Sequence, residues 1–448
     1  MAGTNLAGAF AGDIENYIAD ETLPLARRQL VAYQFGDPLT LPEGRGTTYT
    51  AYRYNRVALP VAPLAEGIAP IGQSMTLNSV SAVAQQWGDR ITITDVAELT
   101  IKHPLFKKAV ELLSMQLAET LERNCFNTLM SGTQVNYVNT RGSRAALIAG
   151  DVLDPLTVIR TNAALETLGA PRYMGDEMTD QKADVDSGGG KASSNPRTMP
   201  HYAAIVHPLV VGDFRQNATV ITAWSYSDIN RLYNYEAGEW SGIRFCKSNM
   251  VPTFTGVAQI TGTAGTAGAL ATNTYFITIT GSDTQNQYES RVYQVSGGIA
   301  VTGPTGSIAV VLPALAGFTF NAYIGLTSTP ANLALSTSGP TTGPLTGQAA
   351  QMAPGQTVIL TGLGVAQIAP SAPATGITVY PTFVLGRGAY GQVVLDNAKF
   401  SYLKDADKSD PLNQVRIAGW KAYYGTLISN NLFYARIESA SAFTSTFG

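Results

Sequence analysis

Residues 104–132 read PLFKKAVELLSMQLAETLERNCFNTLMSG and predict one long α-helix around which the chain is organised. Pro104 stands where the first turn of a helix tolerates proline, and Gly132 stands where helices commonly end. Apolar side chains recur every three or four residues on one broad face, namely Leu105, Phe106, Ala109, Val110, Leu113, Leu117 and Leu121. The opposite, polar face carries Lys107, Lys108, Glu111 and Glu122. At about 1.5 Å per residue the helix spans roughly 40 Å, the width of a whole domain.

The composition indicates a surface that is largely covered by partners. The chain has 448 residues, enough for two or three domains with a substantial core. Only 14% of the residues are charged, against about 25% in a typical soluble domain. Because so few charges solvate a large surface poorly, we expect extensive contacts with other subunits. The net charge of −3 and the lack of long basic runs argue against a DNA-binding protein that reads sequence, but not against a container for DNA.

Cysteine content and the N-terminal sequence argue against a secreted or membrane-spanning protein. Cys125 lies in the predicted long helix and Cys246 in a predicted strand, and two cysteines cannot brace so long a chain. We therefore interpret both as buried free thiols. The first residues lack a basic segment followed by an apolar run, so no signal peptide is expected. No stretch approaches about 20 uninterrupted apolar residues, so no membrane span is expected either.

The sequence before the long helix predicts an arm and a β-ribbon, neither with a core of its own. Residues 1–46 are interrupted by prolines, and we expect this arm to hold a conformation only against another surface. Residues 47–58 and 75–94 resemble strands and together predict a long two-stranded hairpin. Because an isolated ribbon is marginally stable in water, it either lies on a partner or belongs to a larger sheet.

Start and stop signals outline a mixed region around the long helix. Residues 95–98 resemble a capping box that leads into that helix. Asp154 and Pro155 predict the start of a second helix, and Gly169 predicts its end. After a polar stretch at 175–200, the pattern predicts strands at 202–206 and 241–247 and a short helix at 208–215.

A change of composition marks a separate all-β region. Between Lys247 and Arg387 the only charged residues are Asp283, Glu289 and Arg291. Short strand-like runs recur there at 275–280, 291–295, 307–312, 318–326 and 357–361. Such spacing is typical of an antiparallel sandwich. We place this domain at 254–376, where it interrupts another domain, because charged sequence resumes afterwards and predicts strands at 379–385, 392–396 and 415–438.

The chemical motifs favour structural roles over catalysis. Gly386, Gly388 and Gly391 match the pattern GxGxxG, but strand-like QVVLD follows where a dinucleotide site needs a helix. We interpret these glycines as a tight turn. His201 and His207 could share a strand face, but no third metal ligand is nearby. We therefore expect no enzyme, no metal site and no cofactor.

The order of parts (an arm, a long ribbon, a long helix and an α+β body) resembles that of the major capsid proteins of tailed bacteriophages. The specific resemblance is to the coat proteins of certain short-tailed phages. It is carried, in the expected order, by the helix ending LERNCFNTL, YAAIVHPLVVGDFR (202–215), GEWSGIRF (238–245), VLGRGAYGQV (384–393), SDPL (409–412) and GWK (419–421). These segments are weak individually but specific as an ordered set.

This resemblance implies an α+β, HK97-like capsid fold. The implied parts are an N-terminal arm (1–46), an extended β-hairpin loop (47–100), a peripheral domain with the spine helix (101–200), an axial domain with the remainder of the capsid core (201–253 and 377–448) and an inserted immunoglobulin-like domain (254–376). The insertion departs from the basic pattern of the family. We expect it to project from the outer surface, because inserted domains with nearby termini are tolerated at exposed loop tips.

The resemblance further implies a major capsid protein that self-assembles into the icosahedral shell around a double-stranded DNA genome. Its partners would be copies of itself in hexameric and pentameric capsomers, a portal, decoration proteins in some shells, and packaged DNA contacted non-specifically on the inner face. We expect a separate scaffolding protein, since no removed N-terminal segment is evident. Assembly would occur in the host bacterial cytoplasm, with the protein residing in the virion.

Six residues are candidates for subunit interfaces. They are Arg53, Arg56 and Trp87 on the predicted ribbon and Asp410, Trp420 and Lys421 in or beside the motifs that carry the resemblance. For the last three, a core or turn role is an equally good interpretation. Two other function classes stay open at this stage. A Thr/Gly-rich surface adhesin would call for a signal peptide and repeated sandwiches, and a carbohydrate-active enzyme would need paired carboxylates in an aromatic cleft.

Overall fold

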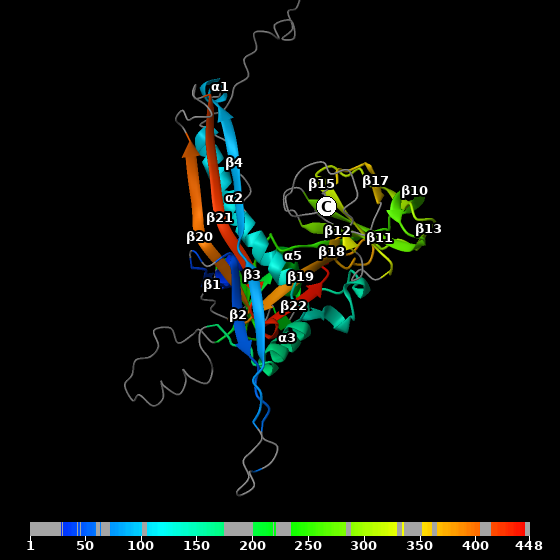
Figure 1. Cartoon of the computed structure of the whole chain (residues 1–448). Helices are drawn as coiled ribbons and strands as arrows, with labels where there is room; N and C mark the ends of the chain where they lie inside the picture. Colours follow the sequence, from blue (N-terminus) through cyan, green and yellow to red (C-terminus); the bar gives the residue numbers. More distant parts are fainter. Residues whose placement is uncertain are drawn as a thin grey trace, which may run out of the picture. The chain divides into compact units, whose positions relative to one another are not determined.

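The computed structural model in Figure 1 is a mixed α+β chain. It describes residues 28, 30–42, 44, 46–59, 63, 72–100, 105–173, 200–217, 219–220, 234–283, 288–328, 334–335, 352–360, 365–403 and 414–443. The described residues form two compact units. Unit 1 comprises Gln86–Ala118 and Asn397–Ala422, and unit 2 comprises Gln29–Gln85, Glu119–Asp396 and Tyr423–Gly448.

The helices are α1 (Asp95–Thr100), α2 (Leu105–Met130), α3 (Pro155–Thr167) and α5 (Pro208–Gln216), and a 3-10 turn, η2, spans Ala32–Phe35. The strands are β1 (Asp37–Thr40), β2 (Thr48–Tyr54), β3 (Leu77–Val83), β4 (Gln85–Thr94), β5 (Val135–Tyr137), β6 (Tyr202–Val206), β7 (Glu236–Trp240), β8 (Ile243–Lys247), β9 (Phe254–Val257), β10 (Gly262–Leu270), β11 (Asn273–Asp283), β12 (Glu289–Tyr293), β13 (Ile299–Val301), β14 (Gly306–Val311), β15 (Phe318–Gly325), β16 (Ala334–Leu335), β17 (Thr357–Leu360), β18 (Val365–Ile368), β19 (Thr378–Leu385), β20 (Tyr390–Leu403), β21 (Val415–Ile428) and β22 (Tyr434–Ser439).

Unit 1 has its own small core. Leu113 from α2 packs with Ala418, Trp420 and Ala422 from β21, and partly buried side chains from β4, α2 and β20 surround them. Gly88 on β4 is required here, because a Cβ on it would lie 2.6 Å from the Trp420 carbonyl oxygen. The close approach of β4 and β21 thus depends on the absence of a side chain.

The predicted capping box at 95–98 is wrong in detail. Thr94 supplies the capping oxygen, which accepts the N–H of Ala97 at 3.4 Å. The Glu98 carboxylate instead forms an ion pair with Arg416 of β21. The six-residue α1 is a separate helix, so the signal marks a helix start, but not the start of α2. The Glu98 carboxylate thus pairs with the Arg416 guanidinium instead of with the backbone N–H that a capping box would supply.

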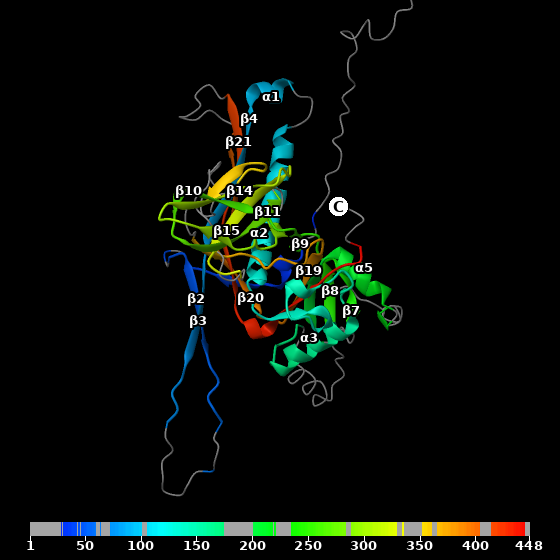
Figure 2. The same ribbon diagram turned by 90° about the vertical axis from the view of Figure 1, so that its right-hand side faces the viewer.

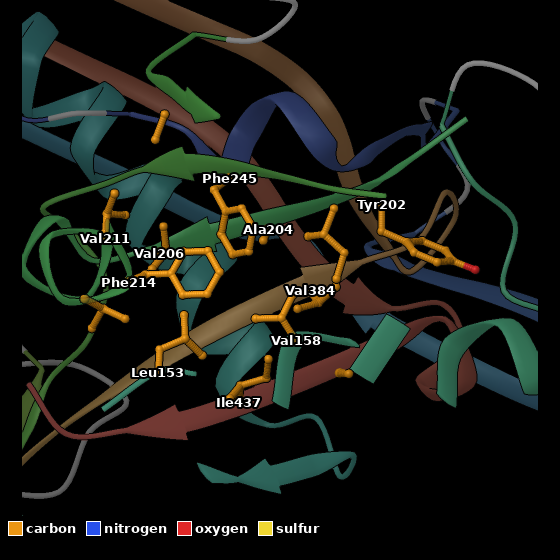
Figure 3. Close-up of a cluster of buried hydrophobic side chains, with 14 of the residues drawn as sticks. Leu153, Val158, Tyr202, Ala204, Val206, Val211, Phe214, Phe245, Val384 and Ile437 are labelled. Carbon is orange, nitrogen blue, oxygen red and sulfur yellow. The ribbon is translucent and has the colours of Figure 1, made fainter. Parts of the chain in front are cut away.

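The largest sheet of unit 2 is centred on β19. This strand pairs with β22, β6 and β9, and the sheet continues through β8 and β7 on one side and through β12, β11 and β15 on the other. Helices α3 and α5 cover the β6–β19–β22 region, where apolar side chains form one cluster (Figures 2 and 3). Within it the rings of Phe214 and Phe245 pack at 5.3 Å between centroids.

Most of the predicted elements around this cluster are confirmed. Helix α3 begins after Asp154, whose Oδ1 accepts the N–H of Thr157, and ends at Thr167, with Leu168 as C-cap and Gly169 next at a φ of +70°. Gly386 and Gly388 of the GxGxxG pattern lie in the turn between β19 and β20, with Gly388 at φ +74°, whereas Gly391 lies in β20 and pairs with Asp37. Cys125 and Cys246 are both buried and free.

The single strand predicted over 75–94 is divided in two. β3 pairs with β2 in register from Thr48 opposite Val83 to Tyr54 opposite Leu77. Ala84 interrupts the strand, and its N–H bonds the Thr47 carbonyl at 2.8 Å. Beyond this point β4 joins β21 in a different sheet, in the order β1–β20–β21–β4. The predicted hairpin is therefore real but ends at residue 83, and its base packs on Val393 and Leu427 of unit 2.

Lowering the pH from 7 to 4.5 is expected to destabilise unit 2 through His207. Its neutral Nδ1 caps α5 by accepting the Leu209 N–H at 3.3 Å, and its ring packs on Tyr380. Burial lowers the pKa of His207 to about 4. The unfolded chain, with a pKa near 6.5, binds this proton more tightly, so stability present above pH 6.5 is lost as the pH falls towards 4. The loss amounts to about 2–3 kcal/mol.

Urea unfolding at both pH values would measure this loss. The control is His207→Asn, which keeps a capping acceptor but does not titrate, and which should lose less stability on acidification. Carboxyl groups elsewhere contribute equally to both proteins and cancel in the comparison. An identical pH dependence of the two proteins would contradict the role given to His207.

Candidate assembly surfaces

The two faces of the β2–β3 hairpin differ in what they contact. Tyr49, Val80 and Ala82 share one face, which at its base packs on the unit 2 cluster around Val393. The other face carries Tyr52 and Tyr54, each 65% exposed, together with the exposed Leu77. Figure 2 shows that the hairpin extends away from its base as a narrow ribbon. A row of exposed aromatic and aliphatic side chains on such a ribbon is a typical contact surface for a partner.

A buried carboxylate anchors the segment at which the N-terminal arm ends. Glu122 on α2 is 0% exposed, and its side chain accepts three backbone N–H groups, from Val31 and Ala32 at 2.6 Å and from Tyr33 at 3.0 Å. These groups open the 3-10 turn η2, so the carboxylate caps that turn as an acidic residue caps a helix N-terminus. Burial raises the pKa of Glu122, and the three N–H donors act against this shift.

Strand β20 holds the carbonyl groups of the same segment. The Tyr390 hydroxyl donates to the Ala32 carbonyl, and Gln392 Nε2 donates to the Tyr33 carbonyl at 2.8 Å. Tyr33 also stacks on Tyr424 of β21. Side chains thus satisfy N–H and C=O groups of a segment that none of the described strands pairs, and β1 pairs with β20 directly afterwards.

The sequence pattern missed Glu122 because α2 buries different faces along its length. In unit 1 the buried residues of α2 are Ala109 and Leu113, whereas in unit 2 they are Glu122, Cys125, Phe126 and Leu129. The nine residues from Leu113 to Glu122 amount to about two and a half turns, so the buried stripe moves to the opposite side of the helix. The spacing of Glu122 from Cys125, Phe126 and Leu129 is the signal that identifies it.

The six predicted interface residues lie in different environments. Arg53 and Arg56 are exposed on the hairpin and beside it. Trp87 packs partly buried in the unit 1 core, where Trp420, 5% exposed, donates from Nε1 to Gln116 Oε1 at 3.1 Å. Lys421 is exposed next to it. Asp410 lies outside the described residues. The structure thus brings Trp87 and Trp420 together in a core.

The described part of the chain has neither a cluster of metal ligands nor a membrane-crossing helix. No group of three or more His, Cys, Asp or Glu side chains there could hold a metal ion. His201 is instead buried beside Tyr173, with which it forms a β-bridge. Within the same residues no helix is both long and apolar enough to cross a membrane.

This chain is similar to known proteins in structure but not in sequence. No protein-family model matches the sequence, and no curated protein is similar to it. Among solved structures, a chain of the cyanophage Pam1 capsid asymmetric unit is similar over 99% of this chain and 100% of its own, with 9% identity and a TM-score of 0.52. The chain has the fold of a phage capsid protein. The predicted α+β, HK97-like capsid fold with its long helix is therefore confirmed.

Two further solved capsids are similar to this capsid fold over almost the whole chain. That of cyanophage P-SCSP1u has 12% identity and a TM-score of 0.49, covering 98% of this chain and 96% of its own. That of Ralstonia phage GP4 has 7% identity and a TM-score of 0.49, covering 98% of both chains.

Proposed function

We propose that this protein is the major capsid protein of a tailed bacteriophage and assembles into the icosahedral shell around its double-stranded DNA. The observation that carries this proposal is the capsid fold, which extends over essentially the whole chain at a TM-score of 0.52. The exposed apolar face of the β2–β3 hairpin supports it, because Tyr52, Tyr54 and Leu77 call for a partner surface. That partner is a second copy of this chain.

Ribbons and arms suit a shell because they add many small interfaces. Each interface can be weak, since closed symmetry makes all of them form together and raises the effective concentration of every contact. The charge-poor composition fits the same arrangement, in which neighbouring copies cover much of the surface. Hexameric and pentameric capsomers, a portal and a separate scaffolding protein complete the assembly, and the inner face contacts DNA without reading sequence.

Negative-stain electron microscopy after sizing by sedimentation tests the proposed function. Expressed protein is expected to form closed, roughly spherical particles or capsomer-sized rings, either alone or with a candidate scaffolding protein. A monomer that persists with the scaffolding protein present would reject the shell function. In that case the adhesin hypothesis would be tested next, by binding to cell-surface glycans.

Charge reversal at Arg53 and Arg56 is expected to impair assembly without unfolding the subunit. Both side chains are exposed, so Arg53→Glu with Arg56→Glu should change the free energy of unfolding by less than about 1 kcal/mol. Facing a neighbouring copy, the reversed charges should reduce the yield of shells at least tenfold, which sedimentation measures. Tyr52→Ser with Tyr54→Ser probes the opposite hairpin face. Normal shells from the arginine variant would remove both arginines from the interface.

The segment 254–376 is an inserted immunoglobulin-like module on the outer surface of the shell. In support, its two sheets share one hydrophobic core, formed by β11 and β15 on one side and β14 and β17 on the other. The chain also enters and leaves side by side, since Gly256 exchanges backbone hydrogen bonds of 2.9 Å with residues 376 and 377. Adjacent ends are what allow a module to be inserted into a loop of another domain.

Deletion of the module is expected to leave assembly possible. The sharpest deletion removes 259–371 and joins the ends with a short glycine linker, because β9 pairs with β19 in the main sheet and should be kept. Shells of wild-type diameter are expected by electron microscopy, with less density on the outside. Complete loss of shells under all conditions, from a deletion variant that still folds, would make the module part of the lattice.

A further inference from the structure

A cavity in unit 2 has the chemistry of an anion site. It has a volume of about 400 Å³ and opens between β5 and α3, beside the turn at 138–142. Two arginines, Arg141 and Arg160, line it, together with threonine, asparagine and tyrosine side chains, and its lining contains no aspartate or glutamate. A concave site of this size with several hydrogen-bond donors in its lining is typical of a small-ligand site.

The turn that carries Arg141 is held in a strained conformation. Asn139 and Thr140 have φ values of 54° and 55°, in the left-handed region that non-glycine residues rarely occupy. Two such residues in succession persist only where the surroundings enforce them. Strain of this kind concentrates at sites that bind ligands, and here it brings Thr140 and Arg141 to the wall of the cavity.

Asp151 enforces that conformation. This carboxylate is buried and accepts Asn139 Nδ2 at 2.7 Å, Arg141 Nε at 2.8 Å and the Ile148 N–H at 2.9 Å. Although burial raises the pKa of Asp151, these donors together hold it below its usual range, so the carboxylate stays charged at neutral pH. Asp151 thus holds Arg141 through Nε and Nη2 of the guanidinium group. The remaining N–H donors of Arg141 are left for a ligand.

Helix α3 supplies the opposite wall. Asn136 Nδ2 donates to Thr161 Oγ1 at 3.3 Å, and Thr161 Oγ1 donates to the Thr157 carbonyl at 2.9 Å, so hydrogen bonds between lining residues join β5 to α3. Arg160, one residue away, is exposed and makes no ion pair or hydrogen bond with any described residue. Asp151 offsets only Arg141, and no carboxylate among the described residues pairs with Arg160, so the lining carries the positive charge of that arginine.

We propose that this cavity binds a phosphate group. Two guanidinium groups present planar donor pairs that match a tetrahedral oxyanion, and the hydroxyl and amide groups between them supply further donors. The phosphate can belong to a small free metabolite or to the backbone of a nucleic acid. Both present the same chemistry to Arg141 and Arg160, and they differ in how binding depends on chain length and on salt.

Calorimetric titration of the purified full-length chain with inorganic phosphate tests the site, at constant ionic strength and with chloride as the blank. Saturable binding is expected for the wild type, with affinity reduced at least tenfold in Arg160→Gln. Arg53→Gln, an exposed arginine on the hairpin, is the matched control and should bind like the wild type. Equal unfolding temperatures of the three proteins without phosphate show that the folds are intact.

Parallel titrations with adenosine monophosphate and with a 12-nucleotide single-stranded oligonucleotide identify which kind of molecule carries the phosphate. An oligonucleotide that binds more tightly than phosphate, with a salt dependence that weakens in Arg160→Gln, assigns the site to a nucleic-acid backbone. Equal affinities for phosphate and oligonucleotide assign it to a free phosphate compound. Absence of saturable phosphate binding to the wild type, or wild-type affinity in Arg160→Gln, overturns the proposal.

Discussion

Glu122→Ala is expected to lower the free energy of unfolding of unit 2 by about 3–5 kcal/mol. The substitution leaves the backbone N–H groups of Val31, Ala32 and Tyr33 without their acceptor, and the first two residues are fully buried. An orphaned buried donor costs about 1–3 kcal/mol, and the gain from removing a buried charge offsets only part of the sum. Urea unfolding measures the loss.

The same variant should free residues 31–33, the segment at which the N-terminal arm ends, before unit 2 unfolds. Hydrogen exchange at residues 31–33 is expected to accelerate by more than about 100-fold, which corresponds to roughly 3 kcal/mol at tenfold per 1.4 kcal/mol. The control is Glu111→Ala on the same helix, whose carboxylate forms an exposed pair with Lys108 at 2.8 Å. That pair should contribute less than about 1 kcal/mol. Similar effects of the two substitutions would contradict the anchoring role of Glu122.

Glu438→Ala is expected to destabilise unit 2 by about 3–5 kcal/mol, because it leaves two buried arginines without their counter-ion. Arg144 donates from Nε to Glu438 Oε2 at 2.7 Å and from Nη2 to Oε1 at 2.5 Å, and Arg436 Nε lies 3.1 Å from the same Oε1. Arg144 also lies over the Phe254 ring at 4.0 Å. The cluster therefore ties β22 to β9, where the proposed insertion begins.

Thermal and urea unfolding of the purified subunit measure this effect. Glu438→Gln keeps the shape of the side chain but not its charge, and it should destabilise by a comparable amount if charge compensation is the cause. The control is Glu166→Ala, which removes the partner of Arg172 from a pair in which the glutamate is 45% exposed. A change of under 1 kcal/mol in Glu438→Ala would show that water, rather than Glu438, compensates the arginines.

Local signals predicted the elements whose ends are determined by nearby residues. Asp154 and Gly169 delimit α3 because a capping oxygen and a left-handed residue act within one turn of the helix. The turn at Gly388 was predictable for the same reason. The strand over 75–94 was not, because Ala84 has no intrinsic tendency to break a strand. The break arises where the chain passes from the β2–β3 ribbon to β21, a strand more than 300 residues later.

Among the candidate assembly surfaces, too, some features were predictable from the sequence and others were not. The pattern of the ribbon and the charge-poor composition predicted a chain that needs partners, and the ordered motifs predicted the capsid fold. The anchoring of residues 32 and 33 depends on Tyr390, Gln392 and Tyr424. These residues are distant in sequence and meet the segment only after folding.

The amino-acid sequence alone predicted helices α2, α3 and α5, the turn at Gly388 and the existence of the hairpin, because periodicity and capping act over a few residues. The class of fold followed from the resemblance that the ordered motifs carry. The tertiary structure decided which face of α2 is buried in each unit. It also placed Trp420 in a core and made Glu122 a buried cap instead of a solvated charge. The physical reason is that a carboxylate can be buried wherever folding brings donors to it, and the donors to Glu122 come from residues about 90 positions away.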